Sequence, residues 1–358
     1  MNMIKSSKKK VIVAGHVCVD ITPIFRKDAK YESLSDVFVP GSLIRVENAA
    51  VTLGGCVSST GLAMKKLGAD VIMMGKIGKD EFGAIVEQAF RKQGGEGLIC
   101  DESVSTSHSI VNAVPGFDRM FLHCPGANDT FVCSDISDEA LENASLFHFG
   151  YPPLMRSMYA DNGSELIKIF KKVKSRGLIT SLDMAFVDDK SDAGKADWKK
   201  IITDVLPYVD IFVPSFEEIC YMVDREKFDY LSSLGGSITD NLSVERDMKP
   251  LADKLIKLGA KTLLLKCGSA GMYYKSGEEE GYQPCFVPDR ICSATGAGDT
   301  SIAAFLTALS EGRSIRECAM FAAAEGACCV ASYDTLSGLL TLDELEKKIN
   351  SGWETRSC

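Results

Sequence analysis

The chain has 358 residues, of which 46% are hydrophobic and 25% charged, and its formal net charge at pH 7 is −9. That length allows one large α/β domain with or without an appendage, or two ordinary domains. The acidic balance argues against a general nucleic-acid binder, which needs a basic surface, and no apolar run is long enough to cross a bilayer. We therefore expect a globular protein of the cytoplasm that binds neither nucleic acid nor membrane.

Cysteine and histidine usage gives no sign of a metal centre. The thirteen cysteines form no Cys-x-x-Cys pair, the only close pair is Cys328 and Cys329, and the four histidines are widely spaced. An odd number of cysteines scattered through apolar segments is typical of reduced core thiols. We expect no metal bound through sulfur.

Short apolar runs alternate with helical patterns along most of the chain. The strand-like runs cover residues 11–14, 71–74, 146–149, 178–183, 211–213 and 262–266, and the helical patterns cover 58–67, 80–92, 164–174, 198–206 and 249–258. Such alternation predicts a mostly parallel sheet with helices on both faces. Ligands of these sheets collect at the carboxyl ends of the strands.

Two regions interrupt the alternation. Residues from about 21 to 52 and from about 103 to 128 carry strand-like pieces with Pro, Gly and polar residues but no helical pattern. Loops of this length in a compact domain are usually functional.

The segment Ala294-Thr-Gly-Ala-Gly-Asp-Thr300 carries the strongest chemical signal, because small residues ending in one acid stand directly before a helical pattern. Gly296, Ala297 and Gly298 leave backbone N–H groups accessible at a helix N-terminus, which is an anion site. An acid at such a site suggests phosphoryl transfer, in which Asp299 takes the proton of the attacking hydroxyl. The alternative from the local pattern is a tight turn with Asp299 as N-cap.

This segment resembles the Asp-Thr-x-Gly-Ala-Gly-Asp signature of the ribokinase-like (PfkB) carbohydrate kinases, with Ser293 in place of the first Asp. The resemblance extends over nearly the whole chain. It implies one ribokinase-like domain over residues 1–358, an α/β fold of three layers with a small β-sheet lid formed by the two interrupting regions. It also implies that Asp299 is the general base and that Gly296, Ala297 and Gly298 hold the developing charge. Lids in this family often pair between subunits, so the resemblance implies a homodimer through the lid.

The resemblance assigns five residues to the sugar. Gly54 and Gly55 match the family's Gly-Gly loop, whose backbone N–H groups meet substrate hydroxyls. Ser59 stands where an Asn commonly binds the substrate. Asp20 resembles an early acid that accepts hydrogen bonds from sugar hydroxyls, and Asn128 resembles a residue of a substrate-facing turn.

It assigns five others to ATP and Mg²⁺. Ser215 and Glu218 match an Asn-x-x-Glu motif, with Ser replacing Asn and the acid holding Mg²⁺ through water, although these residues could instead begin a solvated helix. Gly268 and Gly271 match a loop that packs along ATP, and Lys266 before them could pair with its phosphates. Residues 332–338 lie where family members often bind a monovalent cation such as K⁺.

The predicted function is ATP-dependent phosphorylation of a small sugar. Cys56 stands where many family members carry a Lys, so a neutral hexose or pentose is favoured over a phosphosugar. Arg119 and Lys266 leave open an acidic sugar such as 2-keto-3-deoxygluconate. Serines at three polar positions of the family leave open a kinase-like scaffold that binds without turnover; they are Ser59, Ser215 and Ser293.

Overall fold

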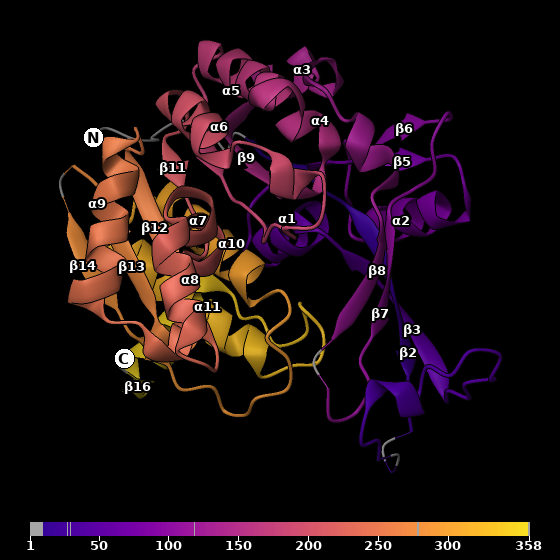
Figure 1. Ribbon diagram of the computed structural model, residues 1–358. Coiled ribbons are helices and arrows are strands. Elements are labelled where there is room, and N and C mark those ends of the chain that lie inside the picture. Colours follow the sequence, from indigo (N-terminus) through magenta and orange to yellow (C-terminus); the bar gives the residue numbers. More distant parts are fainter. Residues whose placement is uncertain (1–9, 27, 29, 118, 278, 357–358) are drawn as a thin grey trace.

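The computed structural model describes residues 10–26, 28, 30–117, 119–277 and 279–356. Its largest element is an eight-stranded sheet with the strand order β14-β13-β12-β11-β10-β9-β1-β4 (Figure 1). The six strands from β12 to β4 run parallel, and β13 and β14 extend the sheet antiparallel. The strands are β1 (Lys10–Gly15), β4 (Val71–Met74), β9 (Ala144–Gly150), β10 (Ile179–Leu182), β11 (Ile211–Phe212), β12 (Thr262–Lys266), β13 (Met272–Lys275) and β14 (Glu280–Gln283).

Helices cover both faces of this sheet. One face packs against α5 (Ser164–Ser175), α6 (Trp198–Val205), α7 (Phe216–Val223) and α9 (Lys249–Lys257). The other packs against α1 (Cys56–Lys66), α2 (Glu81–Lys92), α10 (Ala297–Ser310), α11 (Ile315–Val330) and α12 (Leu342–Asn350). The smaller elements are α3 (Asp138–Glu142), α4 (Arg156–Tyr159), α8 (Arg225–Ser233), β5 (Lys76–Gly78), β6 (Ile99–Asp101), β15 (Cys285–Phe286) and β16 (Thr355–Arg356).

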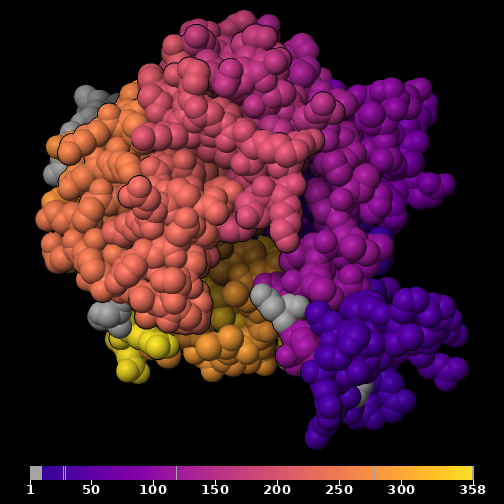
Figure 2. Space-filling view, viewed as in Figure 1, coloured from indigo at the N-terminus to yellow at the C-terminus, as the bar shows by residue number. Residues whose placement is uncertain are grey.

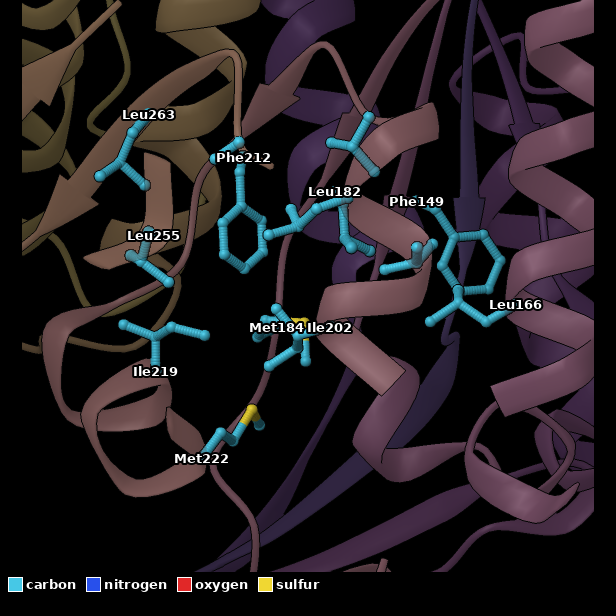
Figure 3. Close-up of a cluster of buried hydrophobic side chains, with 14 of the residues drawn as sticks. Phe149, Leu166, Leu182, Met184, Ile202, Phe212, Ile219, Met222, Leu255 and Leu263 are labelled. Atoms are coloured by element: carbon cyan, nitrogen blue, oxygen red, sulfur yellow. The ribbon is translucent and has the colours of Figure 1, made fainter. Parts of the chain in front are cut away.

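The predicted alternation is confirmed, and every predicted strand and helix is present with its ends within two residues of those expected. The reason lies in strand geometry, because successive side chains point to opposite faces. In β1, Ile12 and Ala14 join the core on one face while Val11 and Val13 join the core on the other. Figure 3 shows the first of these cores, where Phe149, Leu182 and Phe212 from the sheet meet helix side chains such as Leu166 and Ile202. Among the described helices, none is long and apolar enough to cross a membrane.

A second sheet, here called the lid, projects from one side of the main body (Figure 1). Its order is β3-β2-β7-β8, from β2 (Cys18–Ile24), β3 (Asn48–Gly54), β7 (His108–Asn112) and β8 (Met120–Cys124). The lid predicted from the two interrupting regions is therefore present. The first two strands extend beyond the predicted region, since β2 begins at Cys18 and β3 ends at Gly54. The early start of β2 arises because the apolar run of β1 continues into β2 after only two residues. Asp20 thus lies on a lid strand.

Glu325 on α11 is fully buried, and its Oε1 atom has no hydrogen-bond partner within the described structure. Its other oxygen accepts a long bond of 3.5 Å from the Leu340 backbone N–H. Burial raises the pKa of Glu325 to about 8 from an ordinary value of 4.5. The side chain is therefore protonated at neutral pH, since an isolated charge in the core is unfavourable.

This burial predicts a pH-dependent stability that Glu325→Gln removes. Between pH 4.5 and about 8 the native protein keeps a proton that the unfolded chain releases, so the contribution of Glu325 to stability falls as pH rises through this window. We expect the unfolding free energies of wild type and variant to be similar near pH 5 and the variant to gain steadily towards pH 8. Urea denaturation at several pH values measures this, with the exposed Glu311→Gln as control. Parallel pH curves for wild type and Glu325→Gln would contradict it.

Candidate active site

A cleft of about 1790 Å³ lies between the lid and the main body. Figure 2 shows the hollow beside the lid, with residues of the C-terminal third at its floor. Six of the residues predicted for the site line it, namely Asp20, Gly54, Gly55, Ser59, Gly296 and Asp299. Residues from distant parts of the chain therefore meet in one cavity, as the predicted site requires.

The floor of the cleft carries the N-terminus of α10. Gly296 is the N-cap with φ 80°, a left-handed conformation that favours glycine, and an added Cβ there would lie 2.3 Å from the Thr335 side chain. At Gly298, inside the first turn, a Cβ would meet nothing closer than 3.8 Å. The first N–H groups of this 14-residue helix are therefore approachable by an anion.

Asp299 lies in the first turn of α10 and is only 5% exposed. Its carboxylate accepts hydrogen bonds from Tyr151 Oη at 2.7 Å and from Thr60 Oγ1 at 3.1 Å. Burial raises the pKa of Asp299, whereas the Tyr151 bond, the Lys266 ammonium and the Thr60 bond oppose this rise. The carboxylate is thus held in one position at the helix start by two hydrogen bonds.

Tyr151 and Thr60 were missed by the sequence reasoning. Tyr151 directly follows β9 and adopts φ 66°, which is rare for a residue other than glycine and occurs often at functional sites. Burial raises the pKa of Tyr151 well above its ordinary value, so its hydroxyl remains a donor. Its position at the carboxyl end of a parallel strand was the available signal. No sequence signal marked Thr60, because its contact with Asp299 arises only from the packing of α1 on α10.

A buried ion pair lies behind Asp299. Lys266 Nζ donates to Asp183 Oδ1 at 2.7 Å, and both side chains are nearly enclosed. Burial alone lowers the pKa of Lys266, but the charges of Asp183, Glu218 and Asp299 outweigh it and raise the pKa. The Lys266 ammonium is therefore stabilised by the negative charge of three carboxylates. Asp183, which the sequence reasoning did not single out, is the direct partner of Lys266.

The residues predicted for the nucleotide lie together at the ends of β11 and β12. Ser215 is the N-cap of α7, its backbone N–H donates to Glu218 Oε2 at 2.9 Å, and it pairs with Lys266 as an isolated bridge. Gly268 and Gly271 form the turn into β13 with φ of 55° and 87°. None of these five residues lines the cleft in the described structure, so they form a region next to it.

The lid side of the cleft depends on glycine for close approach. A Cβ at Gly54 would lie 2.3 Å from Asp20 Oδ2, so the carboxylate sits directly over that backbone. Gly55 has φ 86°, and a Cβ there would lie 2.5 Å from the His16 carbonyl oxygen. Burial raises the pKa of Asp20, and hydrogen bonds from Cys18 and Ser109 oppose the rise. Ser59 lies further along α1 and is 9% exposed.

Asn128 is placed differently from the prediction. Its side chain is fully buried and does not line the cleft. The amide accepts from the Val17 N–H at 3.2 Å and donates to the Val17 carbonyl at 3.0 Å. The 3₁₀ turn Gly126–Thr130 directs the side chain inward, so Asn128 joins this turn to the chain between β1 and the lid. The expected contact with substrate is not supported, because both polar ends of the amide are occupied.

These features agree with what the chain resembles among known proteins. Residues 10–342 match the family described as pfkB family carbohydrate kinase. The chain belongs to that family. It is a sugar kinase of the ribokinase-like fold, in which a mostly parallel sheet between two helical layers carries a small additional sheet.

Individual relatives of this kinase are distant. It is 28% identical to a ribokinase of Arabidopsis thaliana over 298 residues, which cover 81% of the chain and 70% of the relative. It is 26% identical to a probable fructokinase-5 of the same plant over 314 residues, which cover 83% and 88%. Among solved structures, Arabidopsis thaliana ribokinase complexed with ribose and ATP superposes with a TM-score of 0.73 at 22% identity, over 95% of this chain and 98% of that one. That last likeness concerns the fold.

We predict that Tyr151→Phe raises the pKa of Asp299 in this kinase. The variant loses the hydroxyl that donates to the carboxylate, so the charged form is less stabilised. A pH titration of carboxyl-labelled aspartate by ¹³C NMR measures the shift, with Asp299→Asn identifying the signal. Tyr333→Phe is the matched control, because Tyr333 also lines the cleft but is 85% exposed. Identical Asp299 titrations in wild type and Tyr151→Phe would contradict the assigned hydrogen bond.

Proposed function

We propose that this kinase transfers the γ-phosphoryl group of ATP to a hydroxyl of a neutral hexose or pentose, with Asp299 as the general base. The observation that carries the proposal is the placement of Asp299, a buried carboxylate at the start of α10 that faces the same cleft as Asp20 and Gly54. An acid beside an anion-binding helix start has a role when it accepts a proton from the hydroxyl that attacks the phosphate.

Each side of the cleft then has its own task. The N–H groups of Gly296, Ala297 and Gly298 stabilise negative charge on the transferred group. Tyr151 and Thr60 hold the Asp299 carboxylate in one orientation towards the sugar hydroxyl. Asp20 and the Gly54-Gly55 backbone, with Ser59, hold the sugar, and closure of the lid over it excludes water that would otherwise accept the phosphate.

The residues behind Asp299 fit ATP and a hydrated Mg²⁺. Lys266 bonds Asp183 directly, and the charges of Glu218 and Asp299 also act on its ammonium, so acids outnumber the cation here and a divalent ion would improve the balance. Mg²⁺ usually keeps several of its waters and binds through one or two carboxylates, so a hydrated ion needs no more than Glu218 from the protein. Bound Mg²⁺ supplies neutralisation of phosphate charge.

In this proposal Glu218 holds the hydrated ion. The residues that line the ATP phosphates and ribose are Ser215, Lys266, Gly268 and Gly271. A monovalent cation such as K⁺ near residues 332–338 remains a prediction.

The charge of the cleft supports a neutral sugar. Its acidic lining residues are Asp20, Asp129, Asp188, Asp299 and Asp334, and its basic ones are Lys92 and Arg119. A sugar acid or phosphosugar would meet a net negative surface. Arg119, the residue that left an acidic sugar open, donates to the Thr295 hydroxyl at the mouth of the cleft. A single arginine at a rim contributes little, typically about 0–1 kcal/mol for an exposed pair.

The serines that left a non-catalytic scaffold open have local roles. Ser215 caps α7, and Ser293 Oγ accepts from the Thr295 N–H at 3.2 Å within the anion loop. Both serines therefore take part in local backbone hydrogen bonds at the site. A scaffold without turnover would not need two hydrogen-bond donors that orient the Asp299 carboxylate.

We also infer a homodimer that pairs through the lid and a cytoplasmic location. Exposed apolar side chains outside the cleft gather on the lid segments; they are Phe38, Val39, Leu43, Ile44, Val46, Val51 and Leu122. Such a patch is large for a surface that stays in water. Apart from Cys267, the cysteines of the described residues form no disulfide, as is usual in a reducing compartment.

A substrate panel tests the function. We expect ADP release to be fastest, as kcat/KM, with an uncharged pentose or hexose, because the carboxylates that line the cleft outnumber its cations and disfavour an anionic sugar. The same measurement is made with the phosphate esters and the acid forms of these sugars. Each compound is tested with wild type and with Arg119→Ala. A preference for an acid that Arg119→Ala abolishes would establish the acidic-sugar alternative. No ADP release with any sugar would contradict the kinase proposal and favour a scaffold.

A further inference from the structure

A row of polar side chains crosses the cleft face of the lid. Thr52, Asp20, Ser109 and His123 lie directly opposite one another on β3, β2, β7 and β8. All four line the cleft. Side chains opposite one another on adjacent strands are about 4.5–5.5 Å apart, so this row is one continuous surface.

The residues next to the row are apolar. Two positions further along the strands, Thr22, Ala50, Val111 and Phe121 also face the cleft. Apart from the Thr22 hydroxyl, this second row offers no polar group. Directional contacts from the lid to a sugar must therefore come mainly from the first row.

His123 ends the polar row in a fixed orientation. Its Nδ1 atom lies 3.0 Å from Ser109 Oγ, and Ser109 in turn donates to Asp20 and favours its ionised form. This leaves Nε2 as the ring atom that can bind a ligand. Burial lowers the pKa of His123, so the ring is neutral. Because Ser109 donates its one proton to Asp20, it accepts from Nδ1, and Nε2 is left to accept a hydrogen bond from a sugar hydroxyl.

His16 provides an independent indication that this wall takes a polar ligand. It lines the cleft and is 2% exposed, and neither of its ring nitrogens has a hydrogen-bond partner within the described structure. Its ring centroid lies 5.4 Å from that of His123 and 6.1 Å from that of Tyr151. Buried polar groups without partners are rare and unfavourable, so two imidazoles tilted at 37° to each other at a cavity wall suit a polar occupant.

We propose that His123 is a specificity-determining residue of the sugar site, where its imidazole, held by Ser109 and backed by His16, binds a sugar hydroxyl. Asp20 and His123 stand two strands apart, about 10 Å between backbones, so they reach different hydroxyls of one ring. The Asp20 carboxylate accepts a hydrogen bond from one sugar hydroxyl. The His123 imidazole binds a hydroxyl at a second position of the ring, so a sugar without that hydroxyl binds less well. The inference rests on the proposed function and names a determinant of its substrate choice.

The test combines His123→Ala with deoxy analogues of the best neutral sugar of the panel. We expect the KM for that sugar to rise about tenfold, with kcat within about threefold and the KM for ATP unchanged, as for the loss of one hydrogen bond. Ser109→Ala should act in the same direction but less. One deoxy analogue, which lacks the hydroxyl that His123 binds, should show no further loss in His123→Ala.

Controls separate binding from folding. His108→Ala is the matched control, because His108 lies on the neighbouring strand with its ring 4.7 Å from Phe82, and it does not line the cleft. His123→Gln, which keeps a polar group near the same place, should recover part of the affinity even if His123→Ala folds poorly. Calorimetry with the sugar alone gives the dissociation constant without turnover.

An unchanged sugar KM and dissociation constant in both His123 variants would overturn the proposal, as would equal losses for every deoxy analogue. If wild type binds a sugar but phosphorylates none, the proposed function fails while the calorimetric comparison still decides the role of His123. If wild type binds no sugar, both fail.

Discussion

The site depends on the burial of one carboxylate. An acid as enclosed as Asp299 is favourable only if hydrogen-bond donors or opposite charges reach it. They come from three parts of the chain, Thr60 on α1, Tyr151 after β9 and Lys266 at the end of β12. Each of these elements ends or begins at the same edge of the parallel sheet. The constraint on Asp299 therefore also fixes where the anion site lies relative to the strands.

The lid supplies a second set of polar groups to this edge. Its strand β2 follows β1 after two residues, so the sheet that carries Asp20 is tied directly to the central sheet. Asn128 strengthens that connection through both polar atoms of the Val17 backbone. In the proposed function, the base and the anion site therefore belong to the main body, while recognition of the sugar belongs largely to the lid.

Local sequence patterns predicted most of the fold and the centre of the site. The alternation of apolar runs and helical patterns placed the strands and helices, and the small residues before Asp299 marked the helix start, because both signals lie within a few neighbouring residues. Asp183 and Tyr151 escaped notice because their partners are far away in sequence. Asn128 was misread for a related reason: a turn motif does not say to which side its amide points. The sequence does not show such distant contacts before the chain is folded.

The account stands or falls on the chemistry of Asp299, and Asp299→Asn tests it most directly. The amide keeps the size of the side chain but cannot accept the proton, so kcat should fall by about 10²–10⁴. The dissociation constants of ATP and sugar should stay close to those of wild type, because the helix start and the lid are unchanged. Turnover near the wild-type rate by a correctly folded Asp299→Asn protein would contradict the assignment of the base.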